Sequence, residues 1–412
     1  MTSSFSHDII VAGTGPAGLI AALLLAHDGH RVALAGPLPN RADRRTTALM
    51  SPSLGVLERV GVLENVARGA AELRSMRIVD ATGRLVRAPT VTFRAAEIGE
   101  QRFGINIPNA HLLDVLADAV SAEPLIDWRQ AMVESYSLTD DRATAILSDG
   151  NEIAGKLLVA ADGRGSRARD AAGITVRSST LPQAALVANF AHSRPHGFIS
   201  TEFHTETGPF TQVPLPGDRS SLVWVLRPAD AERMKGWDDA RLSQAIEQRM
   251  GSMLGHVAVE SGRQAFPLTT LTPSTLARSR TVLVGEAAHV FPPIGAQGLN
   301  LGIRDIADLA SVAAAHRDDP GSPAALSAYD RRRRLDVTAR STAVNLLNGS
   351  LLSSLLPAQM ARSVGLAALD AFAPLRGFFM REGLVPGSGF AGLGDMLRLP
   401  LRERGPAAAR RT

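Results

Sequence analysis

Short apolar runs and a helical stretch alternate at the start of the chain. Residues 8–12 form an apolar run without polar alternation, which is typical of a strand buried on both faces of a parallel sheet. A glycine-rich turn follows, then an apolar stretch with helical character over residues 17–26, and residues 31–35 predict a second strand. This order predicts a β-α-β unit of about 30 residues.

The next part of the chain has the pattern of strands around one helix. Residues 76–93 predict strands that are broken at residues 80–83. A proline at the start and apolar residues at helical spacing predict a helix over residues 108–122. Residues 131–161 predict a β-meander, whose last strand, residues 156–161, runs into a loop with candidate chemistry.

The second half of the chain divides into a strand-rich and a helical part. Residues 183–224 are rich in β-branched and aromatic residues and predict an antiparallel sheet in a separate lobe, with a turn at residues 214–218. Residues 281–284 predict another buried strand, followed by a glycine-rich loop and a helix from about residue 297. Residues 323–402 have a mostly helical pattern. The chain is therefore predicted to be α/β, with a Rossmann-like domain, an inserted antiparallel-sheet domain and a C-terminal helical region.

The composition is that of an ordinary globular protein, and it narrows the chemistry. Hydrophobic residues make up 45% and charged residues 20% of the 412 residues. The pI of 10.2 accompanies a net charge of only +4, because Lys156 and Lys235 are the only lysines and the other cations are arginines. The charge therefore does not indicate a nucleic-acid partner. The absence of cysteine excludes disulfides, a thiolate metal site, a thiol nucleophile and a flavin attached through cysteine.

The apolar pattern also bears on location. Residues 8–12 follow the first residue so soon that they predict a core strand rather than a signal peptide. No apolar run reaches the length of about 18 residues that indicates a transmembrane helix. We therefore expect a cytoplasmic protein.

The first candidate site lies between the first strand and the first helix, and its residues are Gly13-Thr14-Gly15-Pro16-Ala17-Gly18. They fit the dinucleotide fingerprint Gly-x-Gly-x-x-Gly, in which the first glycine permits the tight turn, the second lets a pyrophosphate approach and the third allows close helix–strand packing. The N-terminus of the helix offers N–H groups and a partial positive charge to the phosphates. The alternative is a glycine turn that only connects strand and helix.

One feature of the dinucleotide fingerprint is missing. An acidic residue about 20 residues further along usually binds the adenosine ribose. Here the second strand ends in Ala35-Gly36-Pro37, without an acid. Arg41, Arg44 and Arg45 follow, and this cluster could accept the 2′-phosphate of NADP. The motif alone does not separate FAD, NAD and NADP.

Two later strand ends carry polar residues. One apolar strand ends at Asp162-Gly163, and Ser166 follows where it could cap a helix, although a solvated strand-to-helix turn is the alternative. Another strand is expected to end at Glu286, an acid that could hold a ribitol hydroxyl, and a Pro-Pro turn and two glycines then present N–H groups to a flat ligand. His289 lies beside two alanines and is expected to be a packed structural histidine rather than a general base.

The three sites, in this order and at these separations, resemble those of the class A flavin monooxygenases with the para-hydroxybenzoate hydroxylase fold. Within that family the chain most resembles the ubiquinone-biosynthesis hydroxylases, on residues 45–49, 285–300 with Arg304-Asp305, and 329–336. We expect an FAD-binding domain in three parts, a substrate domain in two parts and a C-terminal helical region. Their predicted boundaries are 1–75, 101–180 and 271–320, then 76–100 and 181–270, and finally 321–412.

The resemblance also implies which residues bind FAD. The pyrophosphate would lie on the turn of Gly13, Gly15, Pro16, Ala17 and Gly18. The remaining implied contacts are Arg45 on the adenosine side, Asp162 and Gly163 in the motif shared with reduced nicotinamide, Gly285 and Glu286 near the ribitol or pyrophosphate, and Pro293, Gly295, Gln297, Gly298, Leu299 and Asn300 along the isoalloxazine. Pro293 is also the candidate catalytic residue, in the loop beside the flavin. Two positions depart from the family pattern, because Gly36 replaces an acid and Glu286 replaces the usual aspartate.

The resemblance implies that NAD(P)H reduces the flavin and that O2 supplies the hydroxyl group for an aromatic ring, which we expect to belong to a polyprenyl phenol of ubiquinone biosynthesis. The alternatives are another flavoenzyme of the same fold, such as a halogenase or a prenyl-chain reductase, and a flavin-binding subunit without turnover. The ring position, the choice between NADH and NADPH, and the oligomeric state stay open.

The C-terminal region has two interpretations. Apolar clusters over residues 346–385 are interleaved with Arg362, Arg376 and Arg381. They predict either a helical cap packed on the FAD domain or a surface that meets anionic lipid or a partner protein. Since a polyprenyl phenol lives in the bilayer, the second interpretation implies peripheral contact with the inner face of the membrane or with a multi-enzyme complex.

Overall fold

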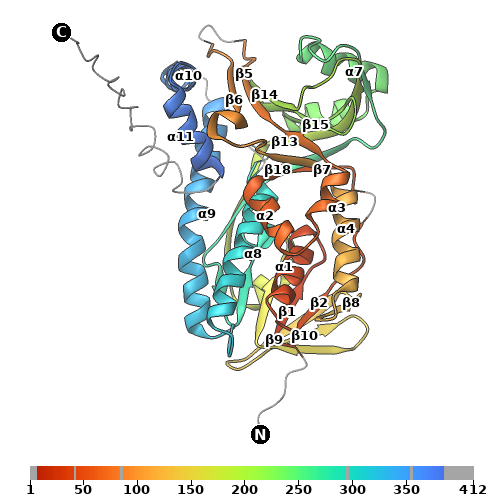
Figure 1. Cartoon of the computed structure of the whole chain (residues 1–412), viewed down its shortest axis with the longest axis vertical. Helices are drawn as coiled ribbons and strands as arrows, with labels where there is room; N and C mark the ends of the chain where they lie inside the picture. The colour runs from red at the N-terminus through yellow and green to blue at the C-terminus, as the bar shows by residue number, and fades with distance from the viewer. Residues whose placement is uncertain (1–6, 41–42, 84–86, 293–296, 353–355, 385–412) are drawn as a thin grey trace, which may run out of the picture.

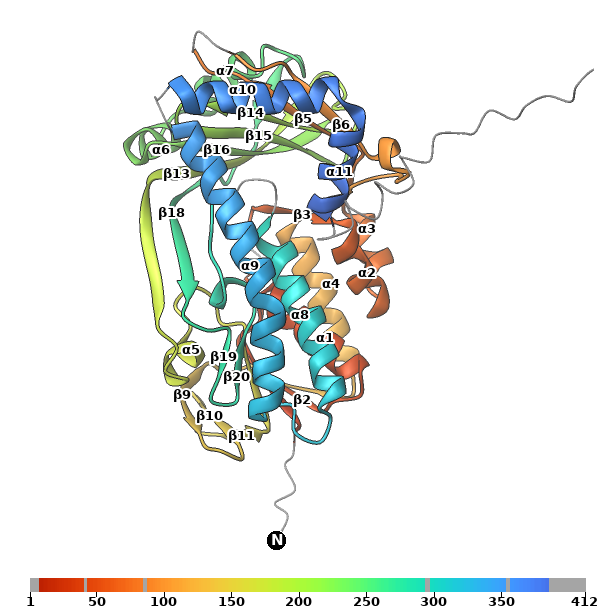
Figure 2. The same ribbon diagram turned by 90° about the vertical axis from the view of Figure 1, so that its left-hand side faces the viewer.

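The protein is represented by a computed structural model that describes residues 7–40, 43–83, 87–292, 297–352 and 356–384. A Rossmann-like domain occupies one end of the long axis and a sheet-rich lobe the other, and C-terminal helices run along both (Figures 1 and 2).

A six-stranded sheet forms the centre of the Rossmann-like domain, in the order β19-β20-β12-β1-β2-β8. All its neighbours pair in parallel except β19 and β20, which are antiparallel. The strands are β1 (Ile9–Ala12), β2 (Val32–Ala35), β8 (Ile126–Arg129), β12 (Leu157–Ala160), β19 (Ala277–Arg278) and β20 (Thr281–Leu283). Every residue of β1, β2 and β12 is buried, as the unbroken apolar runs predict.

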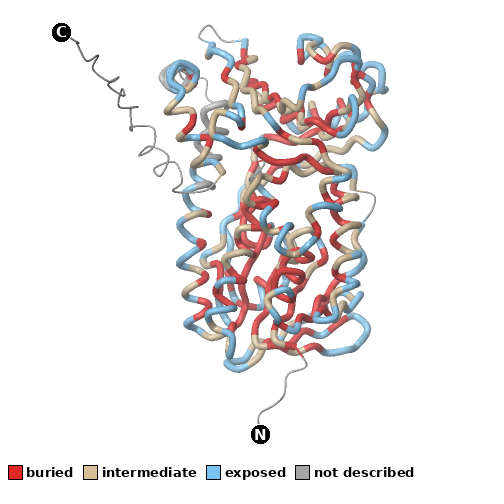
Figure 3. The backbone as a smooth tube through the Cα atoms, in the orientation of Figure 1, coloured by how far each residue is buried: buried red, intermediate tan, exposed pale blue. Residues whose placement is uncertain are grey.

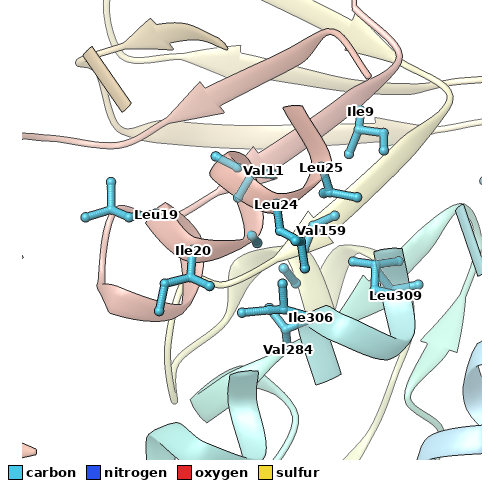
Figure 4. Packing of buried hydrophobic residues seen from close by; sticks show 14 of the residues in the cluster. Ile9, Val11, Leu19, Ile20, Leu24, Leu25, Val159, Val284, Ile306 and Leu309 are labelled. Atoms are coloured by element: carbon cyan, nitrogen blue, oxygen red, sulfur yellow. The ribbon is translucent and has the colours of Figure 1, made fainter. Parts of the chain in front are cut away.

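Helices cover one face of this sheet. They are α1 (Pro16–His27), α4 (Asn109–Ala122) and α8 (Gln297–Ala315). Leu24 of α1, Val159 of β12 and Ile306 of α8 meet in one apolar core (Figure 4). Buried residues are concentrated in the strands of the central sheet and in α1 (Figure 3). The loops at the strand ends are therefore held in place by a rigid core.

A three-stranded meander contributes to the same core from β9 (Val133–Leu138), β10 (Ala143–Leu147) and β11 (Glu152–Gly155). The prediction of a meander through residue 161 was wrong in its last strand. β12 leaves the meander and pairs in parallel with β1, because its four apolar residues are buried on both faces in the central sheet.

The lobe is an eight-stranded sheet in the order β17-β13-β16-β15-β14-β5-β6, with β18 paired to β13. Its strands are β5 (Ser75–Asp80), β6 (Val91–Arg94), β13 (Val176–His192), β14 (Ile199–Thr205), β15 (Gly208–Leu215), β16 (Arg219–Leu226), β17 (Val257–Val259) and β18 (Gln264–Pro273). The predicted antiparallel sheet is confirmed except for one parallel pair, β5 with β14. β13 and β18 pair from the Rossmann-like domain into the lobe, so the predicted boundary at residues 180–181 falls inside β13.

The two faces of the lobe sheet have different neighbours. On the outer face, Phe210 and Trp224 pack in one cluster with Leu242 of α7 (Asp239–Arg249), and α6 (Pro228–Lys235) joins them. On the other face, Ser221 Oγ accepts a hydrogen bond of 2.9 Å from Thr46 Oγ1 of the Rossmann-like domain. Because strand side chains alternate, residues two positions further along β16 also face the cofactor domain.

A small sheet lies where the two domains meet, in the order β3-β7-β4. Its strands are β3 (Thr46–Met50), β4 (Ala71–Leu73) and β7 (Gly104–Pro108). The shorter helical elements are α2 (Ser51–Arg59), α3 (Leu63–Arg68), α5 (Arg167–Ala171), η1 (Ala95–Ile98) and η2 (Gly285–Ala287).

Three helices complete the described chain, α9 (Pro323–Leu352), α10 (Leu356–Ala371) and α11 (Ala373–Leu384). α9 rises along the Rossmann-like domain, α10 lies across the lobe and α11 turns back toward the domain junction (Figure 2). Among the described residues, no single helix is long and apolar enough to cross a membrane, whereas Ser363–Ala371 and Ala373–Leu384, bent by 107°, meet that test of length and composition only as a pair.

Candidate cofactor-binding site

The glycine turn after β1 leaves an open space in front of α1. Gly13 has a φ of 112°, and a Cβ there would overlap the carbonyl oxygen of Ala161. A Cβ at Gly18 would overlap the carbonyl oxygen of Gly13, so no larger residue fits between helix and strand. At Gly15, by contrast, a Cβ would have no atom within 4 Å. No side chain caps α1, whose first N–H groups therefore face this open space.

The missing acid after β2 has a structural explanation. Gly36 has a φ of 153°, and a Cβ there would be 2.8 Å from Thr14 Cγ2. Thr14 Oγ1 donates a hydrogen bond of 2.6 Å to the carbonyl of Pro37. Trp128 Nε1 donates to the carbonyl of Gly36 at 3.1 Å. The turn after β2 thus packs directly on the glycine turn, and position 36 has no room for an acidic side chain.

Asp162 stands at the end of β12 with one free oxygen. Its Oδ2 accepts a hydrogen bond of 3.1 Å from Ala168 N, whereas Oδ1 is buried and has no partner in the described part of the chain. Ser166 Oγ accepts from Arg169 N at 3.0 Å, which confirms the predicted helix cap. Burial raises the pKa of the nearby Tyr136 hydroxyl and the charge of Asp162 raises it further, so Tyr136 stays a neutral donor. A buried acceptor without a partner is costly, so Asp162 Oδ1 is available to accept a hydrogen bond from a ligand or a water molecule.

Glu286 brings the second and third sites together. β20 ends at Leu283, so the expectation of a strand that ends at the acid was wrong, and Glu286 lies in the short helix η2. Its carboxylate accepts hydrogen bonds of 3.0 and 3.3 Å from Arg164, which follows Gly163. Both side chains are about half exposed, at 53% for Glu286 and 48% for Arg164. A charged ligand can therefore reach either partner.

Arg45 lies between the Rossmann-like domain and the lobe. Its guanidinium donates to Asp43 at 2.9 and 2.8 Å and lies 5.6 Å from the ring centre of Phe266 on β18. The hydrogen bonds to Asp43 raise the pKa of Arg45, and the charge of Glu286 adds to this effect. The charges of Arg45 and Glu286 are therefore close enough to interact.

The predicted flavin loop is described only in part. Pro293 and Gly295 lie outside the described residues, and Gln297 is described as the first residue of α8 without its side chain. Leu299 is half-buried on the first turn of α8, and a Cβ at Gly298 would have no atom within 4 Å. The start of α8 is therefore open at Gly298, as the start of α1 is at Gly15.

Asn300 and His289 are held inside the protein. Asn300 Oδ1 accepts from Met50 N at 2.8 Å and from Ser53 Oγ at 2.7 Å, and Nδ2 donates to the carbonyl of Ala48 at 2.7 Å. This amide ties α8 to β3 and α2. His289 is 3% exposed, with Nε2 2.7 Å from Asp305 Oδ2, so the prediction of a packed structural histidine is confirmed.

A cavity of about 410 Å³ lies beside the second and third sites. It is lined by Arg164, Gly165, the hydroxyl-bearing Ser178, Ser179, Thr180, Thr269 and Thr270, and the apolar Phe266, Pro267, Leu271 and Val290. The backbones of Leu271 and Val290 hydrogen-bond at 2.9 and 3.1 Å, so β18 is joined to the segment that precedes the flavin loop.

Three contributors to this region were missed at the level of the sequence. Thr14 fills the space of the absent acid, Arg164 pairs with Glu286, and Asp305 binds His289. Arg164 had a local signal, because it directly follows the Asp-Gly motif, and Asp305 lies in a segment that carries the family resemblance. The open turn at Gly15, the unpartnered oxygen of Asp162 and the open start of α8 together fit an extended dinucleotide such as FAD.

Comparison with known proteins gives the family. A family model described as an FAD binding domain matches residues 6–343. Ubiquinone hydroxylase UbiL of Rhodospirillum rubrum is 30% identical over 92% of this chain and 89% of its own length. The 3-demethoxyubiquinol 3-hydroxylase of Escherichia coli is 29% identical over 88% of this chain and 94% of its own. The solved structure of pqsL, a probable FAD-dependent monooxygenase from Pseudomonas aeruginosa, has a TM-score of 0.74 and 22% identity, covering 87% of this chain and 99% of that one.

Proposed function

The chain belongs to the FAD-binding domain family and is an FAD-dependent monooxygenase, and on this premise we propose that it hydroxylates the ring of a polyprenyl phenol in ubiquinone biosynthesis. NAD(P)H is the electron donor and O2 the co-substrate. The observation that carries the proposal is the similarity to two ubiquinone hydroxylases along about nine-tenths of the chain, which includes the substrate lobe and not only the cofactor motifs.

The cofactor assignment follows from the open positions of the site. Gly15 and the N-terminus of α1 would hold the pyrophosphate, and Asp162 Oδ1 would accept a hydrogen bond from a hydroxyl of the cofactor. Glu286 would contact the ribitol side, with Arg164 as its partner. The isoalloxazine would lie at the start of α8, near Gln297 and Gly298. When bound, FAD accepts a hydride from NAD(P)H and activates O2 for transfer to the ring.

The chain's own residues provide charge stabilisation and exclude water. The N-terminus of α8 carries a partial positive charge that stabilises negative charge on a bound ring. The lobe face turned to the cofactor domain bears Val223 and Val225 two and four residues after Ser221, and Leu268 packs with them. These packed apolar side chains would keep water away from a ring bound beside this face.

The test is product analysis with an isotope. The purified protein with FAD is incubated with NADH or NADPH, labelled O2 and phenols that carry prenyl chains of increasing length. We expect a product with one labelled oxygen on the ring, and turnover that rises with chain length. Consumption of NAD(P)H with peroxide as the only product for every phenol would refute the substrate class. Halide-dependent product or oxygen-independent chain reduction would instead support the two alternative flavoenzymes.

We further propose that α10 and α11 bring the enzyme to the lipid that holds this substrate. The inner side of α11 packs on the rest of the protein, because Met380 is buried and Arg376 Nε donates to Glu97 at 2.7 Å. Val364 of α10, Phe372 between the two helices and Phe379 of α11 are 66%, 57% and 52% exposed. A helical cap and a lipid contact are thus two sides of the same helices, and apolar residues rather than Arg376 make the outer contact.

Matched variants separate the two sides. Phe372→Ser with Phe379→Ser should leave the melting temperature within a few degrees of the parent and reduce sedimentation with lipid vesicles. Met380→Ser removes a buried contact and should lower the melting temperature, since truncating a buried apolar side chain costs about 2–5 kcal/mol. Equal vesicle binding by the parent and the double variant would refute the lipid contact.

A further inference from the structure

Two segments that carry the family resemblance have no role yet in cofactor binding, Arg304-Asp305 and residues 329–336. In the structure they come together at one buried ion pair. Asp305 on α8 and Arg333 on α9 have side chains that are 1% and 3% exposed, and Arg333 Nε donates to Asp305 Oδ1 at 2.8 Å. Such a pair is costly to bury unless its remaining groups are satisfied, so its other partners indicate what it does.

The second oxygen of Asp305 holds both ends of the turn that contains Glu286. Asp305 Oδ2 accepts hydrogen bonds from Gly285 N at 3.1 Å and from His289 Nε2 at 2.7 Å. The backbone N–H groups of Ala288 and His289 donate to the carbonyl of Gly285 at 2.9 and 3.0 Å and close the turn. One carboxylate therefore fixes the first and last residues of the segment that presents Glu286 to Arg164.

The turn is also packed tightly against its surroundings. Gly285 has a φ of 60°, and a Cβ there would be 3.1 Å from the Cβ of Ala17 on α1. A Cβ at Gly302 of α8 would be 3.1 Å from the Cα of Gly285. The ring of His289 stacks on Phe291 with centres 5.4 Å apart. A shift of Asp305 would thus move a segment that touches the glycine turn on one side and leads into the flavin loop on the other.

Arg333 links this turn to α9. Its Nη1 donates to Asp308 at 3.0 Å and to Asp336 at 2.9 Å, so one guanidinium joins carboxylates of both helices. On the same face of α9, Tyr329 Oη donates to the carbonyl of Leu283 at 2.7 Å, at the end of β20. The position of α9 is therefore tied to the strand end and to the turn that follows it.

We propose that Asp305 is a positioning residue of the cofactor site and that Arg333 holds its carboxylate in place, so that α9 helps to set the affinity for FAD. Neither side chain contacts the cofactor itself in this proposal. They act through Gly285, His289 and the orientation of Glu286. The proposal rests on FAD binding and is independent of which phenol is the substrate.

The main test is the variant Asp305→Asn. Its amide keeps the shape but has only one oxygen, so either Arg333 Nε–H or the Gly285 N–H and the His289 ring lose their acceptor. We expect the dissociation constant of FAD, measured by flavin fluorescence on the apoprotein, to rise by about tenfold or more, as one unsatisfied buried group implies. The visible spectrum of the bound flavin should also change.

A control is a second arginine–aspartate pair of this domain, Arg280 with Asp319, in which the arginine is buried and the aspartate is 39% exposed. Arg280 Nη1 and Nη2 donate to Asp319 at 2.6 and 3.0 Å, and Arg280 directly precedes β20, at the end opposite to Glu286. Asp319→Asn should lower the melting temperature and leave the FAD dissociation constant within about twofold of the parent value. Asp319 makes no hydrogen bond to the glycine turn at residues 13–18 or to the turn at residues 285–289.

A milder variant covers the case in which Asp305→Asn does not fold. His289→Asn removes one donor to Asp305 and keeps the ion pair with Arg333, and it should still weaken FAD binding severalfold. If both variants lower the melting temperature as the control does and bind FAD within twofold of the parent, the pair is only structural and the proposal is overturned. Failure of the parent to bind FAD would instead refute the flavoprotein assignment.

Discussion

Alanine substitutions at Gly15 and Gly18, three residues apart, should have different effects. Gly15→Ala should weaken FAD binding and leave folding nearly unchanged, whereas Gly18→Ala should destabilise the fold. At Gly15 the backbone has φ −72° and ψ 175°, which alanine adopts readily, and a Cβ would have no atom within 4 Å. At Gly18 a Cβ would overlap the backbone carbonyl oxygen of Gly13, which cannot rotate away. The first change therefore fills the ligand space, and the second forces helix and strand apart.

The magnitudes follow from these surroundings. Replacing the N-cap Gly15 of α1 by alanine costs roughly 0.5–1 kcal/mol of helix capping, and the reduced entropy of the unfolded chain offsets about 0.4–1 kcal/mol of this. The apoprotein stability should hardly change. If the methyl group displaces two hydrogen bonds from backbone N–H groups to a phosphate, at about 1.5–3 kcal/mol each, FAD affinity falls by more than about 100-fold. Gly18→Ala should destabilise the apoprotein by about 1–3 kcal/mol or more, as overpacking does.

The assay combines two measurements on each variant. Thermal melting of the apoprotein reports folding, and titration with FAD by fluorescence quenching reports binding. The larger variant Gly15→Val should abolish FAD retention altogether. The reasoning would be refuted if Gly15→Ala bound FAD as the parent does, or if its apoprotein melted as far below the parent as Gly18→Ala.

Two further predictions concern charged residues. Glu286→Ala should weaken FAD binding by about 1–3 kcal/mol, the scale of one hydrogen bond to a charged group, and leave apoprotein melting unchanged, because its pair with Arg164 is half exposed; unchanged FAD affinity would remove Glu286 from the site. The hydrogen bond from Arg219 lowers the pKa of Glu260, so this carboxylate stabilises the fold above its unfolded pKa and loses the effect as the pH falls. The difference in melting temperature between the parent and Glu260→Gln should therefore be largest near neutral pH and should disappear below about pH 4. A difference independent of pH would contradict this.

The pattern of the chain was sufficient to predict the elements that depend on neighbouring residues. The run over residues 8–12, the glycine turn and the helix that begins at Pro16 were predictable because burial on both faces, tight turning and capping are local demands on consecutive residues. The cap at Ser166 was predictable for the same reason. The three motifs, in their order, also resemble those of one family, and in the structure each follows a strand of the central sheet.

Contacts between distant segments were decided only by the tertiary structure. β12 was expected in the meander and pairs with β1 instead, because burial of its four apolar residues in the central sheet outweighs continuation of the hairpins. The absence of an acid at Gly36 is explained by Thr14, which lies 22 positions earlier in the chain and fills the space. Asp305 reaches His289 and Arg333 across 16 and 28 positions. No local pattern encodes such pairs, because the free energy of a buried polar group depends on which partner the fold brings within hydrogen-bonding distance.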